Sequence, residues 1–456
     1  MLKPSISTNS TFTSNFVKSF QSEIVFIIVT TISGIVLARY LGPSGRGQYV
    51  TITMWGTLLA WYLNCNVYLT VIYYWKNFKK EQLDFLKTLF IAGLILGVIG
   101  CGIGELFIIP YILTELNHQT MTAAKVYLLT VILGIACDVI LGALAAENRF
   151  NFANITRILN PFLVTSGMVI LSLNNSLNLA SALYVLFSVN SIIAISTFIY
   201  GYKNGFFKGK VRFKLLFTLW YGVKAQGGSI ADATAGNAST MILSLMLPPA
   251  ALGYYSTARS SVGPLSSASK AIQRVSFPKL TGISSETINE RTMNLWRKSL
   301  LLNVIIAIPF TLCLPFLIPL LFGMDYKLSI VPAFILVLFI LIDGQTMIFR
   351  NAVNGFGKTM VNTTTEVISA LFIITTLLLT VSHWGVLGAS VVTVISASLK
   401  LVIYIYEYNK SVKKIVWKQF LPTGEDIRYL FDSFRSLYLR FFRLFLRKRA
   451  FKQNNY

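Results

Sequence analysis

The chain has 456 residues, of which 54% are hydrophobic and only 12% are charged, and its formal net charge is +23. Soluble domains carry about 25% charged residues, so this composition excludes a water-soluble globule. Apolar segments long enough to cross ~30 Å of hydrocarbon recur throughout, and they predict an all-α polytopic membrane protein, because a helix satisfies its own backbone hydrogen bonds in lipid. The predicted transmembrane spans, about twelve in number, cover residues 22–41, 49–74, 85–109, 121–146, 157–173, 180–201, 222–247, 253–278, 298–322, 329–350, 362–382 and 384–406.

Lysine and arginine are unevenly distributed over the connections between these spans. The connections after even-numbered spans hold sixteen of them, whereas those after odd-numbered spans hold only Arg46, Lys125 and Lys327 near the membrane. Cytoplasmic loops carry the excess of positive charge, so the even-numbered connections are predicted to be cytoplasmic. Both termini are then cytoplasmic as well, and the Ser/Thr/Asn-rich residues 1–19 form a short tail rather than a signal peptide.

The first two spans meet at the sequence Gly-Pro-Ser-Gly-Arg-Gly of residues 42–47. It superficially resembles a phosphate-binding loop, but it lacks the GKS/T ending and a preceding strand. We interpret it as a tight extracytoplasmic turn, because glycine and proline supply turn dihedrals. Two charged residues lie near the ends of these spans. Arg39 is a candidate substrate-binding residue and Glu23 a candidate for coupling or an ion pair, with an interfacial position as the alternative for both.

This junction occurs twice in the chain. A shift of 206 residues aligns residues 33–59 with residues 239–265 without a gap, with eight identities: Ser33/Ser239, Leu37/Leu243, Leu41/Leu247, Pro43/Pro249, Gly47/Gly253, Tyr49/Tyr255, Thr51/Thr257 and Leu59/Leu265. We predict two similar six-helix lobes, residues 1–205 and 206–410, related by a parallel repeat because an even number of spans separates the copies. In transporters the substrate site lies at the interface between such repeats.

The span 222–247 carries charges that are costly in lipid. Asp232 lies near its middle, and Lys224 lies two turns before it. A carboxylate at that depth needs a partner or a proton. We expect Asp232 to pair with Lys224 or with a cation of the next span, or to carry a coupling proton, and a structural ion pair is an equal alternative. Lys224 is itself a candidate substrate-binding residue.

The span 253–278 is too polar to face lipid and is the main candidate site. Arg259, Lys270 and Arg274 are eleven and four residues apart, so on a continuous helix they project within roughly 60° of one another. This cationic face predicts an anion-binding site, since charges at membrane depth require water or partners. The alternative is that Lys270 and Arg274 extend to the cytoplasmic interface and serve no substrate.

The C-terminal residues 411–456 are basic and contain apolar residues at helical spacing. Leu430, Phe434, Leu437, Phe441 and Leu444 alternate with arginines, as in amphipathic helices that lie on anionic inner leaflets. Anionic membrane lipids are therefore the predicted partner of this tail, with docking of a cytoplasmic protein as the alternative. Because the bilayer accounts for the basic residues, we expect no nucleic-acid partner.

The sequence contains no signal for catalysis or for a metal site. Cys65, Cys101, Cys137 and Cys313 are isolated within apolar spans, without a CxxC pair or a nearby histidine. His118 and His383 lack neighbours at metal-ligand spacing. We therefore expect no catalytic residue, no metal and no cofactor, and the chain is predicted not to be an enzyme. Coupling to a proton or sodium gradient is left open.

Three motifs carry a resemblance to a known family. Residues 37–49 resemble the junction of helices 1 and 2 in polysaccharide exporters of the multidrug/oligosaccharidyl-lipid/polysaccharide superfamily. Residues 253–259 and 277–280 resemble helix 8 of the same proteins, and residues 354–358 their turn between helices 10 and 11. The resemblance covers residues 15–410 and is most specific in the first motif. It implies two lobes that enclose a central cavity alternating between the two faces of the membrane.

The resemblance implies a flippase for polyprenyl-pyrophosphate-linked oligosaccharides, such as O-antigen or capsule units, in the cytoplasmic (inner) membrane. Lipopolysaccharide or other surface polysaccharide biosynthesis is then the process served, with other polysaccharide-assembly proteins as further partners. Two alternatives remain: a cation-coupled multidrug exporter of the same superfamily, and a membrane-embedded glycosyltransferase or polymerase. The excess of cations in the spans 222–247 and 253–278 disfavours cationic drugs, and the short outward loops disfavour the enzyme.

Overall fold

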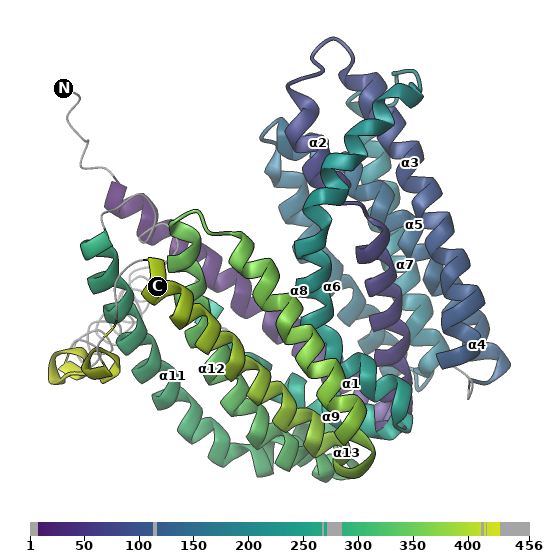
Figure 1. The fold of residues 1–456 in the computed structure, drawn as a ribbon. Coiled ribbons are helices and arrows are strands. Elements are labelled where there is room, and N and C mark those ends of the chain that lie inside the picture. Colours follow the sequence, from purple (N-terminus) through teal and green to yellow (C-terminus); the bar gives the residue numbers. More distant parts are fainter. Residues whose placement is uncertain are drawn as a thin grey trace, which may run out of the picture. The chain divides into compact units, whose positions relative to one another are not determined.

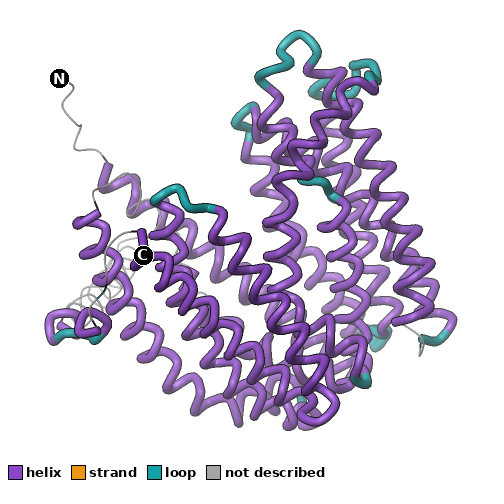
Figure 2. The backbone as a smooth tube through the Cα atoms, in the orientation of Figure 1, coloured by secondary structure: helices purple, strands orange, loops and turns teal. Residues whose placement is uncertain are grey.

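The computed structural model describes residues 8–112, 116–266, 269–270, 285–411, 415 and 417–428. The helices are α1 (Thr8–Leu63), α2 (Val67–Trp75), α3 (Gln82–Ile103), α4 (Ile109–Ile112), α5 (His118–Ala146), α6 (Phe150–Leu173), α7 (Leu179–Lys203), α8 (Leu219–Met246), α9 (Pro249–Val262), α11 (Ser285–Phe322), α12 (Ile330–Gly355) and α13 (Met360–Ser411) (Figure 1). Short 3₁₀ or π turns join some of them, and no strand occurs in these residues (Figure 2). The predicted all-α fold class is confirmed.

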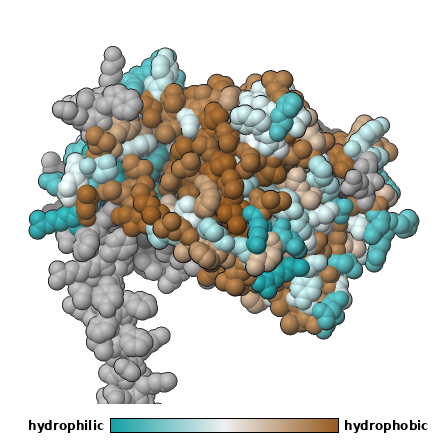
Figure 3. All heavy atoms as spheres, turned by 90° about the horizontal axis from the view of Figure 1, so that it is seen from below, coloured by the Kyte–Doolittle hydropathy of each residue, from teal (hydrophilic) through white to brown (hydrophobic). Residues whose placement is uncertain are grey.

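Eight helical stretches in the described part are long and apolar enough to cross a membrane. Two of them, Ile27–Trp75 and Met360–Ser411, are 49 and 52 residues long, more than twice the ~20 residues that one crossing needs. Each therefore accommodates two of the predicted spans. The α8 helix covers the predicted span 222–247 to within one residue, and α9 covers the first part of the predicted span 253–278, of which residues 267–268 and 271–278 lie outside the described part. On the face shown in Figure 3, apolar side chains cover much of the surface.

The chain divides into two compact units, which do not follow the two halves of the sequence. The first unit contains residues 1–264, 313–336 and 362–396, and thus includes α1 to α9. The second contains residues 265–312, 337–361 and 397–456. The first unit has its largest apolar core among α1, α2, α3, α5 and α7, around Phe85, Leu89 and Ile135, which are fully buried. The division into lobes at residues 205 and 206 remains a prediction.

The predicted turn between the first two spans is a kink within α1. Gly42 has a φ of 63°, a left-handed conformation that favours glycine, and Pro43 follows it. The second copy of the junction differs, because Pro248 is extended and Pro249 begins α9, as proline does at the first position of many helices. A similar kink divides α13 at Gly385, whose φ is 51°.

The two copies of the repeat contact each other in the first unit through reciprocal residues. A Cβ atom added to Gly47 would overlap the carbonyl oxygen of Pro249, and one added to Gly253 would overlap the carbonyl oxygen of Pro43. Exchanging the two copies converts one contact into the other, as rotation about a local twofold axis would. The glycines in both copies are thus required by the close approach of α1 and α9.

The predicted span 49–74 is interrupted. The α1 helix ends at Leu63, and α2 begins at Val67, because Cys65 and Asn66 are left-handed with φ values of 49° and 48°. The side chain of Asn64 accepts a hydrogen bond from the Val67 N–H at 3.1 Å. Irregular backbone at membrane depth is tolerated where it is buried or lines a cavity. This break therefore indicates a cavity nearby.

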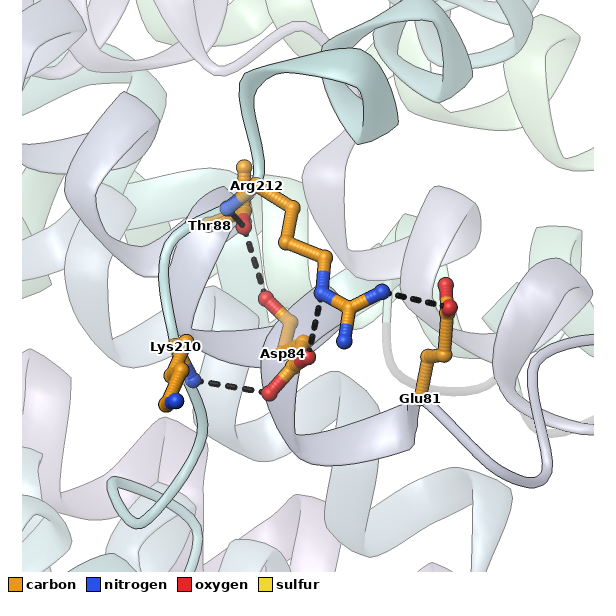
Figure 4. Close-up of polar contacts among 5 residues, drawn as sticks. All are labelled: Glu81, Asp84, Thr88, Lys210 and Arg212. Atoms are coloured by element: carbon orange, nitrogen blue, oxygen red, sulfur yellow. Dashed lines mark hydrogen bonds and ion pairs between the residues drawn. The ribbon is translucent and has the colours of Figure 1, made fainter.

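The connection between α7 and α8, residues 204–218, is attached to the N-terminal end of α3 (Figure 4). The guanidinium of Arg212 forms ion pairs of 2.6 Å with both Glu81 and Asp84. The backbone N–H of Lys210 donates to Asp84 Oδ1 at 2.7 Å, and that of Arg212 donates to Thr88 Oγ1 at 2.9 Å. We call these five residues the linker clamp, since they hold the chain between the two sequence halves against α3.

The second unit has a separate aromatic core. Trp296, Phe349 and Tyr408 pack in it, with ring centroids 5.1 Å and 5.3 Å from Phe349. Arg297 on α11 pairs with Asp426 at 2.7 Å, which attaches residues 423–428 to this unit. The predicted amphipathic helix of the tail lies mostly beyond residue 428, outside the described residues.

Candidate functional site

A cavity of about 420 Å³ lies where the two repeat copies pack in the first unit. We call it the arginine cavity. Its walls come from α1, α8 and α9, and its lining residues are Val50, Thr53, Met54, Thr57, Leu58, Asn237, Thr240, Tyr255, Ser256, Arg259 and Ser260. Hydroxyl and amide groups dominate its polar surface, and the lining includes one cation and no carboxylate. The cavity is therefore suited to a group with negative charge.

Arg259, the first member of the predicted cationic face, lines this cavity. Its side chain is exposed, and Nη2 donates to the carbonyl oxygen of Gly236 on α8 at 3.1 Å. This is the one hydrogen bond that the structure gives Arg259 among the described residues. A guanidinium has five N–H donors, so most of them remain for a ligand.

A second arginine lies behind the cavity wall. Arg46 is only 4% exposed and donates from Nε to Ser256 Oγ at 3.1 Å and from Nη2 to Ser260 Oγ at 3.0 Å. It also donates to the carbonyl of Gly34, and its guanidinium carbon lies 5.3 Å from the centroid of the Phe322 ring. Because each serine oxygen accepts from Arg46, its own proton points elsewhere. The Ser256 hydroxyl donates to the carbonyl oxygen of Gly253, whereas Ser260 lines the cavity and its hydroxyl has no recorded acceptor among the described residues.

A larger cavity of about 650 Å³ lies beside the chain break between α1 and α2. We call it the amide cavity, because its lining includes Asn64, Asn66, Asn190 and Gln226; Trp61 and Thr57 also line it. Asp138 on α5 is the one charged residue of this lining, and Asn64 Nδ2 donates to its Oδ2 at 2.6 Å. Thr57 lines the arginine cavity as well, so the two cavities share a wall.

The other predicted site residues lie apart from the two cavities. Arg39 donates to the carbonyls of Leu320 and, at 2.8 Å, Leu321, in the last turn of α11. A cation is favourable at a helix C-terminus, so Arg39 caps that helix. Lys224 is exposed, with Nζ 5.4 Å from the centroid of the Trp220 ring.

The remaining predicted site residues lie on α8, in the second unit or outside the described part. Asp232 is exposed on α8, and its role in coupling remains a prediction. Lys270 is exposed in the second unit, whereas Arg259 belongs to the first. Between them α9 ends at Val262 and a 3₁₀ turn covers Gly263–Leu265, since proline at 264 cannot donate to a helical hydrogen bond. Arg274 and the side chain of Glu23 lie outside the described part.

Three residues that form or support the two cavities were not predicted as site residues from the sequence. The sequence places Arg46 in an outward turn and Asn64 in a continuous span, and Asp138 is not among the predicted site residues. The asparagine at 66 was a local signal, because asparagine tolerates the left-handed conformation that it adopts here. Among the described residues, no group of three or more His, Cys, Asp or Glu side chains is arranged to hold a metal ion.

Comparisons with known proteins identify the family and the fold. A family model described as "Polysaccharide biosynthesis protein" matches residues 36–332, which include the second repeat copy and all but the first three residues of the first. No curated protein matches the chain in sequence. Its fold is similar to that of the lipid II flippase MurJ in an inward closed conformation, with a TM-score of 0.68, 16% identity and 88% of each chain covered.

Other solved structures share the fold. An inward-facing multidrug resistance MATE transporter of the MOP superfamily has a TM-score of 0.67 and 12% identity, with 86% of this chain and 96% of that one covered. A MOP superfamily transporter from Pyrococcus furiosus has a TM-score of 0.51 and 14% identity, over 87% of this chain and 93% of that one. These likenesses establish a polytopic, all-helical transporter fold.

Proposed function

Since the chain belongs to the polysaccharide biosynthesis protein family, we propose that it is a flippase for polyprenyl-pyrophosphate-linked oligosaccharides in the cytoplasmic membrane. It moves the head group of this lipid from the inner to the outer leaflet, where surface polysaccharides such as O-antigen are assembled. The fold shared with a lipid II flippase supports a lipid-linked substrate. The chain then acts by transport, with no chemical step on the substrate.

The observation that carries this proposal is the arginine cavity. Arg259 faces it with most of its donors unused, Ser260 offers a hydroxyl proton, and the lining lacks carboxylates. Arg46 adds a second positive charge behind the wall. Charge-assisted hydrogen bonds from a guanidinium suit a pyrophosphate, and they are stronger away from bulk water. The anionic part of the lipid head group is therefore bound here, between the repeat copies, as in other transporters built from repeats.

A multidrug exporter is the second candidate, favoured by the shared fold of MATE transporters and by Asp138 in the amide cavity. The two functions require opposite charges in the substrate. A flippase depends on Arg259, whereas an exporter of cationic drugs depends on Asp138 and is indifferent to Arg259.

The test is flipping of a fluorescent polyprenyl-pyrophosphoryl saccharide in proteoliposomes. We expect Arg259→Ala to lower the rate roughly 10- to 100-fold, because a hydrogen bond to a charged group contributes about 1.5–3 kcal/mol. Arg259→Lys recovers part of the loss, since an ammonium cannot form two parallel hydrogen bonds with a phosphate.

The control is Lys125→Ala, which removes a cation that pairs with Glu105 outside both cavities. It should leave the rate unchanged. A wild-type rate in Arg259→Ala, or an equal loss in Lys125→Ala, would reject the arginine cavity as the pyrophosphate site. Export of cationic drugs without any flipping would favour the second candidate.

A further inference from the structure

The lining of the amide cavity differs in charge from that of the arginine cavity. The larger cavity has one carboxylate, Asp138, and neither lysine nor arginine, while the smaller one has Arg259 and no carboxylate. A pyrophosphate-linked oligosaccharide also has two chemically distinct parts. We propose that the amide cavity binds the saccharide, and that Asp138 selects neutral or amino sugars against uronic acids. This inference rests on the proposed function.

The groups in the amide cavity are those that recognise sugar hydroxyls. Asp138 receives one hydrogen bond from Asn64, on Oδ2, and this leaves Oδ1 to accept from hydroxyls. Asn64 is held in turn by the Val67 N–H, so the carboxylate has a fixed position. Asn66 adds amide donors and acceptors, and the half-exposed ring of Trp61 offers an apolar face to a pyranose ring.

Continuity of the two cavities matches the covalent structure of the substrate. The first sugar is bonded directly to the pyrophosphate, so its binding site must adjoin the phosphate site. Thr57 on α1 lines both cavities, and Gln226 of α8 closes the wall by donating to the carbonyl of Trp61. Volumes of 420 Å³ and 650 Å³ both lie in the range of ligand sites.

The selectivity follows from electrostatics. A hydroxyl of a neutral sugar donates to the Asp138 carboxylate, and an ammonium of an amino sugar pairs with it. A uronic acid instead brings a second negative charge into a lining without cations. Two such charges about 6 Å apart, at an effective dielectric constant of about 20, repel enough to weaken binding roughly 100-fold.

The experiment compares two matched probes, polyprenyl-pyrophosphoryl disaccharides with glucose or glucuronic acid on N-acetylglucosamine. Their Kd values are measured by fluorescence anisotropy with the full chain in detergent. We expect the wild type to bind the glucose probe roughly 100-fold more tightly and Asp138→Asn to reduce this ratio to about threefold. Ser229→Lys, which adds a cation to the same lining, should favour the glucuronic acid probe and provides a second variant if Asp138→Asn does not fold.

Two control variants separate this inference from the proposed function. Arg259→Ala should weaken both probes equally and leave their ratio unchanged, and Glu105→Gln, a carboxylate outside the cavity, should change neither Kd. Failure of both probes to bind the wild type overturns the proposed function itself. Equal wild-type Kd values, or a ratio that persists in Asp138→Asn, overturn the saccharide assignment alone.

Discussion

The linker clamp gives a prediction whose size follows from its geometry (Figure 4). In Arg212→Ala, the ion pairs with Glu81 and Asp84 are both lost. The three side chains are 39%, 32% and 17% exposed, so solvent screens the pairs and each contributes about 0.5–1 kcal/mol. The loss of both should lower the free energy of opening the clamp by about 1–2 kcal/mol, which is roughly tenfold in its opening equilibrium.

Hydrogen exchange measures this opening directly, because two backbone amides belong to the clamp. The N–H groups of Lys210 and Arg212 donate to side chains of α3, and they exchange when the connection detaches. We expect exchange in a peptide that covers residues 208–214 to be roughly tenfold faster in Arg212→Ala. The difference should shrink at 1 M salt, where screening acts over about 3 Å.

Lys210→Ala is the matched control. It removes an exposed cation from the same segment, but the contact of Lys210 with Asp84 is made by its backbone, which alanine retains. Exchange should stay at the wild-type rate. If Lys210→Ala accelerates exchange as much as Arg212→Ala, the effect comes from net charge and the clamp argument fails. It also fails if Arg212→Ala leaves exchange unchanged.

Three further predictions concern other contacts. Gly47→Ala should destabilise the fold by about 3 kcal/mol or more, because the added methyl group would overlap the backbone of Pro249. Gly102→Ala is the control and should not destabilise the fold, because the space around its Cβ position is open; thermal melting in detergent measures both variants. Arg46→Met should not lower the melting temperature, because it removes the cost of burying a cation. It should weaken pyrophosphate binding, because Ser260 loses the hydrogen bond that orients its hydroxyl. A lowered melting temperature with normal pyrophosphate binding would contradict this prediction. Desolvation acts to raise the pKa of Asp426, but hydrogen bonds from Thr423 and Arg297 outweigh it and lower the pKa. The ionised Asp426 carboxylate therefore stabilises the fold fully above the pKa of an unfolded aspartate, about 3.9, and this stabilisation is lost as the pH falls through the lower pKa of the folded state. The melting temperatures of the wild type and of Asp426→Asn should converge only in that acidic range.

The sequence was sufficient for the helical class, the positions of most spans and the repeat, because these depend on local apolar length and on identities at a fixed offset. It also indicated Arg259 as a candidate site residue, because a charged side chain on an apolar span requires water or a partner. The clamp and the amide cavity could not be predicted in this way. Their members are far apart along the chain, as Asn64 and Asp138 are, or Asp84 and Arg212. Only packing brings such pairs together.

The helix break at residues 64–66 and the turn at 263–265 were missed for a related reason. Apolar length sets where a chain crosses the membrane, but it does not report whether each crossing is one continuous helix. At Asn66 the left-handed conformation ends one helix and begins another within a stretch that remains hydrophobic. At Gly263–Leu265 the proline interrupts the helix on which the angular argument for Arg259 and Lys270 depended.

The reciprocal contact between the repeat copies has a consequence for Arg46. Under the 206-residue offset its counterpart is Leu252, which is fully buried on α9. A homodimer of one half would place two identical guanidinium groups close to its symmetry axis, where their repulsion and the cost of burying both charges would oppose association. Joining the halves in one chain removes that constraint, because each copy can then change separately. The chain thus keeps the symmetric backbone contact of a dimer but has a buried arginine on only one side of that contact, and this makes the adjoining cavity asymmetric in charge.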